Sequence, residues 1–137
     1  MELNLNDFKR FEKQIILKKI SISGQKKIKN SKVLIIGMGG LGNPLVTYLA
    51  AAGVGNLGIV DYDKVELSNL NRQTLFNLSD VGKFKVVHSK IKINKIYKNI
   101  KNKIFKKKIL KKNKKRIFKK YEIICDGTDN FDTRYLI

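Results

Sequence analysis

Glycines at positions 37, 39, 40 and 42 follow an apolar run and precede a helix-like segment. Glycine has no Cβ, so backbone N–H groups in such a turn can approach a phosphate closely, and the start of the helix adds favourable polarity. The spacing G-x-G-x-x-G between a strand and a helix is typical of nucleotide sites. The alternative is a tight turn whose glycines serve packing alone.

An acidic residue, Asp61, ends a second apolar run that begins at Leu57. Its distance from the glycines, about 20 residues, suits a carboxylate that binds ribose hydroxyls in a dinucleotide-binding domain. To this point, the pattern fits an NAD(P)-dependent oxidoreductase as well as any other nucleotide-binding protein.

Two cations and a carboxylate then follow in separate segments: Arg72, Lys85 and Asp129. The cations can offset the charge of β- and γ-phosphates, and the aspartate can bind Mg²⁺. A nicotinamide site needs none of the three, so they favour a triphosphate with a metal ion. The oxidoreductase remains the alternative.

At these residues the chain resembles the ThiF/MoeB/HesA adenylyltransferases, relatives of the ubiquitin-activating enzymes. The resemblance extends over nearly the whole chain and rests on six ordered motifs, at residues 10–15, 37–42, 51–55, 61–63, 68–73 and 126–134. Two residues depart from the family pattern. Lys13 replaces an arginine that in family dimers reaches the partner's ATP, and Phe84 replaces a proline.

The resemblance implies an ATP-dependent adenylyltransferase that activates the C-terminal glycine carboxylate of a ubiquitin-like sulfur carrier protein for thiamin or molybdopterin sulfur transfer. Catalysis is expected from Arg72, Lys85 and Asp129, with Asp129 also as the Mg²⁺ ligand. The full nucleotide site that it implies consists of Gly37, Gly39, Gly40, Gly42, Asp61, Ser68, Asn69, Leu70, Asn71, Arg72, Lys85, Asp129, Asn130 and, towards a partner's site, Lys13.

The same resemblance implies a homodimer in the complete protein. It also places the carrier-binding strands, the sulfur-handling cysteine and the zinc-binding C-x-x-C pairs beyond Ile137. We therefore expect residues 1–137 to form the N-terminal part of one adenylation domain, unable to complete adenylation alone. A truncated, non-catalytic remnant or interaction module is a further alternative.

The formal net charge is +19, and no Asp or Glu occurs between Lys83 and Tyr121. Such a stretch binds polyanions non-specifically at low salt. However, nearly all the basic residues are lysines, whereas arginine is preferred for base and bidentate phosphate recognition. Lys, Ile and Asn together indicate A/T-rich codons, so we interpret the run as a solvated face and do not expect nucleic acid as a partner.

At 137 residues the chain has the length of one domain. It lacks the run of about 18 apolar residues that a membrane span requires, and it begins without a secretion signal. The single cysteine, Cys125, excludes an internal disulfide. These features lead us to expect a cytoplasmic protein.

The order of apolar and polar segments predicts how these residues are positioned. We expect helices over 6–20, 25–30, 41–52, 81 to the mid-nineties and 111–119, strands over 32–36, 57–61, 103–107 and 122–125, and a last helix from Phe131. Strands that alternate with helices indicate an α/β, Rossmann-like, doubly wound and mostly parallel sheet behind an N-terminal helical segment. The ligand should then lie at the carboxyl ends of the strands.

Overall fold

The structure, a computed structural model, describes residues 1–137. A single parallel sheet of four strands forms its centre, in the order β3-β2-β1-β4. The strands are β1 (Lys32–Ile36), β2 (Asn56–Val60), β3 (Lys101–Phe105) and β4 (Ile123–Asp126). The chain passes from β1 outward to β2 and β3, and then returns to place β4 on the other side of β1.

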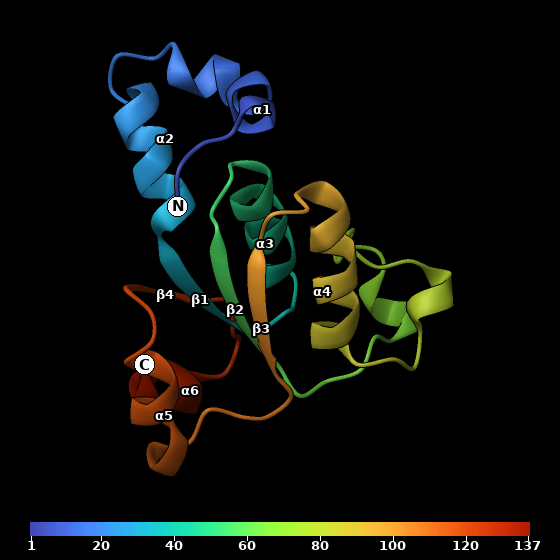
Figure 1. The fold of residues 1–137 in the computed structure, drawn as a ribbon. Coiled ribbons are helices and arrows are strands. Elements are labelled where there is room, and N and C mark those ends of the chain that lie inside the picture. Colours follow the sequence, from blue (N-terminus) through green and yellow to red (C-terminus); the bar gives the residue numbers. More distant parts are fainter.

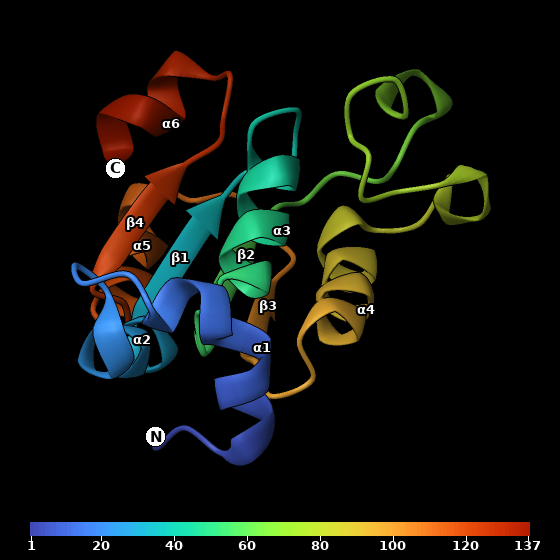
Figure 2. The same ribbon diagram turned by 90° about the horizontal axis from the view of Figure 1, so that it is seen from above.

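Helices connect the strands and cover both faces of the sheet, as Figures 1 and 2 show. α3 and α4 lie on one face and α5 on the other, which confirms the doubly wound α/β fold. The helices are α1 (Leu5–Ile15), α2 (Ser21–Asn30), α3 (Gly42–Ala51), α4 (Lys85–Ile96), α5 (Lys111–Phe118) and α6 (Phe131–Leu136). No helix combines the length and the apolar character that crossing a membrane would require.

The two faces of the sheet bury two separate apolar clusters, because successive strand residues point to opposite sides. Val33, Ile35, Leu57 and Ile59 pack under α3 and α4 in the larger cluster. The smaller cluster lies under α5 and consists of Leu34, Ile36, Val60, Ile109 and Ile117. β1 and β2 are therefore buried on both faces, which explains their continuous Val, Ile and Leu composition.

Several element boundaries differ from the sequence-based expectation, among them the start of α2, which is Ser21 and not residue 25. α1 ends at Ile15 instead of continuing to Ile20, and a turn separates it from α2. α4 begins at Lys85, because Phe84 is extended and forms an antiparallel bridge with Lys64. β3 begins two residues early, at Lys101, where its N–H donates to the Gly55 carbonyl and sets the register with β2.

Asp80 does not cap α4, which begins five residues later at Lys85. Asp80 instead belongs to the short 3₁₀ turn η2 (Leu78–Asp80), where its carboxylate accepts the N–H of Asn77 at 2.9 Å. The same buried carboxylate contacts His88 and Lys92 on α4. Asp80 therefore attaches the loop before α4 to the middle of that helix, at His88 and Lys92.

A buried ion pair attaches the N-terminal helices to the sheet domain. Lys29 on α2 lies 2.5 Å from the carboxylate of Asp7 on α1, and Tyr97 after α4 donates its hydroxyl to the same carboxylate at 2.6 Å. Burial opposes ionisation of Asp7, but the hydrogen bonds from Lys29, Tyr97 and the Asn4 N–H outweigh it and lower the pKa of the carboxyl. The pair thus stabilises the fold at neutral pH.

We expect Lys29→Met to destabilise the protein by about 2 kcal/mol, because the buried Asp7 carboxylate keeps Tyr97 but loses its counter-charge. Since the pKa of Asp7 is lowered in the folded protein, its contribution is present above the ordinary Asp pKa and is lost as the pH falls through the folded value. Denaturant unfolding at neutral and acidic pH measures both effects. Lys27→Met, at an exposed position of the same helix, is the control, and an equal loss in the two variants would contradict the assignment.

Candidate nucleotide site at the carboxyl ends of the strands

A cleft of about 920 Å³ opens at the carboxyl ends of β1, β2 and β4. It lies where the chain order reverses, with β2 and β4 on opposite sides of β1. Parallel α/β sheets bind ligands at this switch point. Its walls are the glycine turn after β1, the segment after β2, the start of α4, the segment before α5 and the segment from β4 into α6.

The glycine turn packs too closely for side chains at two positions. A Cβ on Gly42 would lie 1.8 Å from the carbonyl oxygen of Gly37, and one on Gly37, whose φ is +89°, would lie 2.9 Å from the backbone of Gly127. These contacts join the ends of β1 and β4 at the start of α3. Gly39 is different, because its Cβ would meet nothing closer than 3.9 Å.

We therefore expect Gly42→Ala to lower the free energy of unfolding by about 2–3 kcal/mol, because the turn must open to relieve a clash with backbone. Gly39→Ala occupies open space in the same turn and should change stability by less than about 1 kcal/mol. Thermal and denaturant unfolding of the two variants compare them directly. Equal stability would show that the turn is not constrained as the structure indicates.

Asp61 is the first residue after β2, and both of its carboxylate oxygens bind the backbone. Oδ2 accepts the N–H of Met38 at 2.6 Å, and Oδ1 accepts the N–H of Asp63 at 2.7 Å. Burial raises the pKa of the carboxyl, although these two hydrogen bonds oppose the increase. The Met38 bond fixes Asp61 beside the glycine turn, on the cleft wall.

Arg72 packs against the glycine turn at Gly40. Its Cδ is 3.4 Å from the position that a Cβ on Gly40 would take. Its guanidinium donates to the carbonyl of Ser68 at 3.2 Å and to the side-chain oxygen of Asn71 at 2.9 Å. No carboxylate pairs with it in the structure, and the residue lines the cleft.

A side-chain hydrogen bond holds the Arg72 segment to the glycine turn. Asn43, in the first turn of α3, is fully buried and accepts the N–H of Leu75 at 2.7 Å. Asn69 is also buried and ends the 3₁₀ turn η1 (Leu67–Asn69), where its side chain accepts the N–H of Glu66. The segment that carries Arg72 is thereby fixed at both ends.

Lys85 is the first residue of α4 and is almost fully buried, with a side chain 8% exposed. Its Nζ lies 3.7 Å from the Asp63 carboxylate, and its N–H donates to the Asp63 carbonyl at 3.0 Å. A buried ammonium group on the cleft wall, with one partly exposed counter-charge, suits an additional anion.

The segment after β4 supplies the third wall. Asp126 accepts the N–H and the hydroxyl of Thr128 at 2.9 and 2.7 Å, and it lies 3.5 Å from Arg134. Asn130 caps α6 by accepting the Thr133 N–H at 3.0 Å. Asp129 lies between them, exposed and with no partner for its carboxylate.

The family model described as "ThiF family" matches residues 11–137. The chain belongs to the ThiF family. It is 43% identical over 135 residues to a probable adenylyltransferase/sulfurtransferase MoeZ of Mycobacterium tuberculosis, covering 98% of this chain and 34% of the relative. It is also 43% identical over 136 residues to an adenylyltransferase and sulfurtransferase MOCS3 of Culex quinquefasciatus, covering 99% and 31%. The chain spans about a third of the length of these curated relatives.

Solved structures agree with this assignment. The crystal structure of PaaA has a TM-score of 0.80 and 32% sequence identity, covering 90% of this chain and 41% of that one. The E. coli tRNA N6-threonylcarbamoyladenosine dehydratase TcdA, solved in complex with ATP, has a TM-score of 0.85 and covers 95% and 53%. At 20% identity this second likeness establishes the fold alone.

The ThiF-family fold brings most of the predicted site residues together. Those that line the cleft are Gly37, Gly39, Gly40, Asp61, Asn69, Arg72, Lys85, Asp129 and Asn130. Gly42, Ser68, Leu70 and Asn71 do not line it. Gly42 shapes the turn, and the oxygens of Ser68 and Asn71 hold the Arg72 guanidinium.

Lys13 lies outside the cleft. It is on α1, where its side chain is 85% exposed and its ammonium lies 3.8 Å from the Glu12 carboxylate. α1 packs through Phe11 against Tyr97, close to the amino ends of the strands. Within one chain, Lys13 therefore cannot take part in this site, and its expected contribution to a partner's site stays a prediction.

Several other residues of this ThiF-family cleft were not expected as site residues. They include Tyr62 and Glu66 after β2, Lys107, Lys108 and Ile109 before α5, and Arg134 in α6. Arg134 belongs to the family motif at residues 126–134, so the sequence did indicate that it could be a site residue. Lys107 and Lys108 were hidden in a lysine-rich stretch, where composition does not distinguish one lysine from another.

Two further residues with chemically reactive side chains, His88 and Cys125, lie outside the candidate site. The Nδ1 atom of His88 lies 2.7 Å from the Asp80 carboxylate, away from the cleft. Cys125 is only partly buried in the edge strand β4, and burial raises the pKa of its thiol. Neither residue lines the candidate site.

Proposed function

We propose that this chain forms the ATP-binding part of an adenylyltransferase that activates the C-terminal glycine carboxylate of a ubiquitin-like sulfur carrier protein. The observation that carries this proposal is the cleft itself, because Arg72 and the buried Lys85, from two separate segments, line the same cavity as the glycine turn. The relatives' printed names, adenylyltransferase and sulfurtransferase, support it. Thiamin and molybdopterin sulfur transfer are both compatible with it.

In the proposed reaction, a carboxylate oxygen of the carrier attacks the α-phosphorus of ATP. The bond from the α-phosphorus to the bridging oxygen breaks, which yields an acyl-adenylate and pyrophosphate. The nucleophile is already ionised at neutral pH, so the reaction requires no general base. Catalysis then depends on alignment of the reactants and on stabilisation of the charge that moves to the leaving pyrophosphate.

The cleft residues have separate roles in this reaction. Amides of the glycine turn around Gly40 bind phosphate oxygens, and Asp61 accepts hydrogen bonds from the ribose. Arg72, Lys85 and Asn69 contact the β- and γ-phosphates. The arginine is held by Ser68 and Asn71, so its guanidinium is positioned before substrate arrives.

The residues present also suit a Mg²⁺ ion. No group of three or more His, Cys, Asp or Glu side chains gathers here, but Mg²⁺ in nucleotide sites usually takes one or two carboxylates together with phosphate oxygens and water. Asp129 has an uncommitted carboxylate on the cleft wall, beside Asn130. Bound there, the ion would neutralise phosphate charge.

Carrier-dependent ATP–pyrophosphate exchange tests this proposal directly. The assay uses this protein, a candidate carrier protein, and a carrier variant without the C-terminal glycine. We expect exchange with the intact carrier and none with the variant that lacks the C-terminal glycine. Exchange without a carrier, or no exchange with any candidate carrier despite bound ATP, would refute the proposed substrate.

A further inference from the structure

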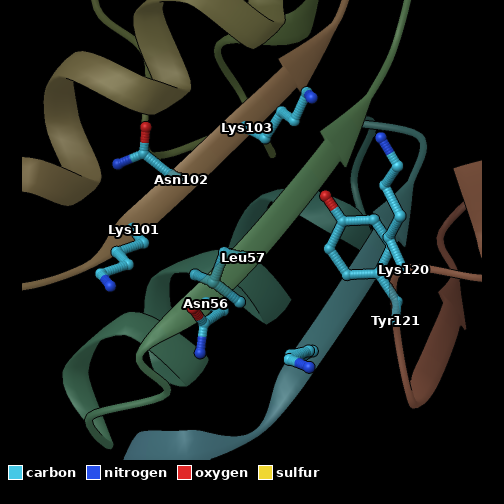
Figure 3. Close-up of a pocket in the computed structure, with 8 residues that line it drawn as sticks. Asn56, Leu57, Lys101, Asn102, Lys103, Lys120 and Tyr121 are labelled. Carbon is cyan, nitrogen blue, oxygen red and sulfur yellow. The ribbon is translucent and has the colours of Figure 1, made fainter. Parts of the chain in front are cut away.

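A second hollow lies at the amino ends of the strands, away from the nucleotide cleft. It measures about 280 Å³. Its floor is the face of the sheet that α5 covers only in part. Figure 3 shows the Tyr121 hydroxyl over β2, with Lys120 on one side of that strand and Lys101 and Lys103 on the other.

The strand register explains why these lysines gather. Lys32, Asn56 and Lys101 are aligned across β1, β2 and β3, and the row two residues later contains Gly58 and Lys103. Residues two apart on a strand share a face. The first row of this face is therefore polar and basic. In the second row Lys103 extends the basic surface, whereas Leu34 already belongs to the apolar cluster under α5.

The hollow is rich in positive charge that the protein does not balance. Four of its lining residues are lysines, and none of the eight is acidic. Lys32, Lys101, Lys103 and Lys120 take no part in the ion pairs of the structure. Ammonium groups that surround one hollow without counter-charges create a positive potential there, which an anion would neutralise.

A hydroxyl donor is built into the same hollow. Gly58 allows the Tyr121 ring to lie directly on the sheet, because a Cβ at this position would be 2.4 Å from the ring carbon Cζ and from the hydroxyl oxygen. Burial raises the pKa of the Tyr121 hydroxyl, so it stays protonated at neutral pH. The hydroxyl has no hydrogen-bond partner in the protein, and it lines the hollow.

We propose that this hollow binds a small, multiply charged phosphate anion of the size of pyrophosphate. Lysine ammonium groups are strongly hydrated point charges that bind phosphate oxygens without bidentate geometry. The Tyr121 hydroxyl donates a further hydrogen bond to the same ligand. The site is separate from the nucleotide cleft, since the two share no lining residue.

Titration of the ¹⁵N-labelled chain with inorganic pyrophosphate tests this proposal, because amide resonances report on both sites at once. We expect saturable shifts at the amides of Gly58, Lys103 and Tyr121. A Lys101→Gln, Lys103→Gln, Lys120→Gln triple variant should weaken this binding by at least about tenfold. Tyr121→Phe keeps the ring on Gly58 and should weaken it a few-fold.

A matched control removes the same charge elsewhere. Lys9, Lys90 and Lys95 are exposed lysines of α1 and α4, and their triple change to Gln should leave the shifts intact. Equal weakening in the two triple variants would reduce the effect to net charge and overturn the proposal. Shifts confined to Gly39 and Gly40 would also overturn it. So would saturable binding of an eight-nucleotide DNA strand without any response to pyrophosphate, since the ligand would then be a nucleic-acid backbone.

Discussion

Arg72→Ala and Lys85→Ala should each lower ATP–pyrophosphate exchange by about 10²- to 10³-fold. Each variant removes one positive charge beside the phosphates, and loss of one such contact to developing charge typically costs about 3–4 kcal/mol of transition-state stabilisation. The two residues are on different segments and both line the cleft. Their separate loss therefore tests whether the cleft works as one site.

Lys83→Ala is the matched control for both variants. Lys83 is an exposed lysine two residues before Lys85 and does not line the cleft, so its loss changes net charge alone. We expect near-normal exchange in this variant. If Arg72→Ala and Lys85→Ala also retained near-normal exchange, the triphosphate assignment would be wrong and the dinucleotide alternative would gain support.

Asp129→Asn should lower activity by about 10²-fold at limiting Mg²⁺ and shift the magnesium requirement to higher concentration. The substitution keeps the shape of the side chain and removes the charge that a hard cation prefers. Because Asp129 is exposed and has no partner in the structure, folding should be unaffected. A magnesium titration of exchange activity, with unfolding measured in parallel, separates these effects.

Asp132→Asn is the appropriate control, since Asp132 is a second exposed acidic residue of the same segment. Asp132 also lines the cleft, so its loss removes the same charge from the same cavity. If Asp129 alone binds the ion, Asp132→Asn should keep the wild-type magnesium titration. A wild-type titration for Asp129→Asn would leave this residue without a role in metal binding. Asp129 would then be only a part of the loop between β4 and α6.

The architecture could be predicted well because its signals are local. Val33 to Ile36 and the glycines after them form an apolar run that ends in a turn, and this pattern is sufficient to identify β1 and α3. The sheet rule then places the residues after β1, β2 and β4 at one edge, where Gly37, Asp61 and Asp129 are found. Only the type and order of the elements were needed for that prediction.

Contacts between distant segments could not be predicted in the same way. The end of α1 and the start of α4 depend on tertiary contacts, such as the bridge between Lys64 and Phe84. Lys107 and Lys108 reach the cleft because β3 ends beside β2, and no local pattern separates them from the other lysines. Asn43 illustrates the same limit, since its bond to Leu75 joins segments 32 positions apart.

Lys13 shows how far a family motif can be carried over within one chain. The resemblance assigned Lys13 to the nucleotide site of a partner subunit, and the structure places it on α1, outside the cleft of its own chain. A motif is recognised from the spacing of neighbouring residues in the sequence. The place of α1 at the amino ends of the strands depends instead on the packing of Phe11 against Tyr97, which sequence spacing does not reveal. A role for Lys13 in a second subunit's site would have to be tested in an assembled dimer.

We propose that the cleft at the carboxyl ends of the strands binds Mg·ATP and not a dinucleotide. Isothermal titration of the 137-residue chain with ATP and with NAD, each with and without Mg²⁺, tests it most directly. We predict one ATP site per chain, tighter with Mg²⁺ and weakened by Lys85→Ala, and no saturable NAD binding. Saturable NAD binding that is independent of Mg²⁺ and unaffected by Lys85→Ala would contradict the account.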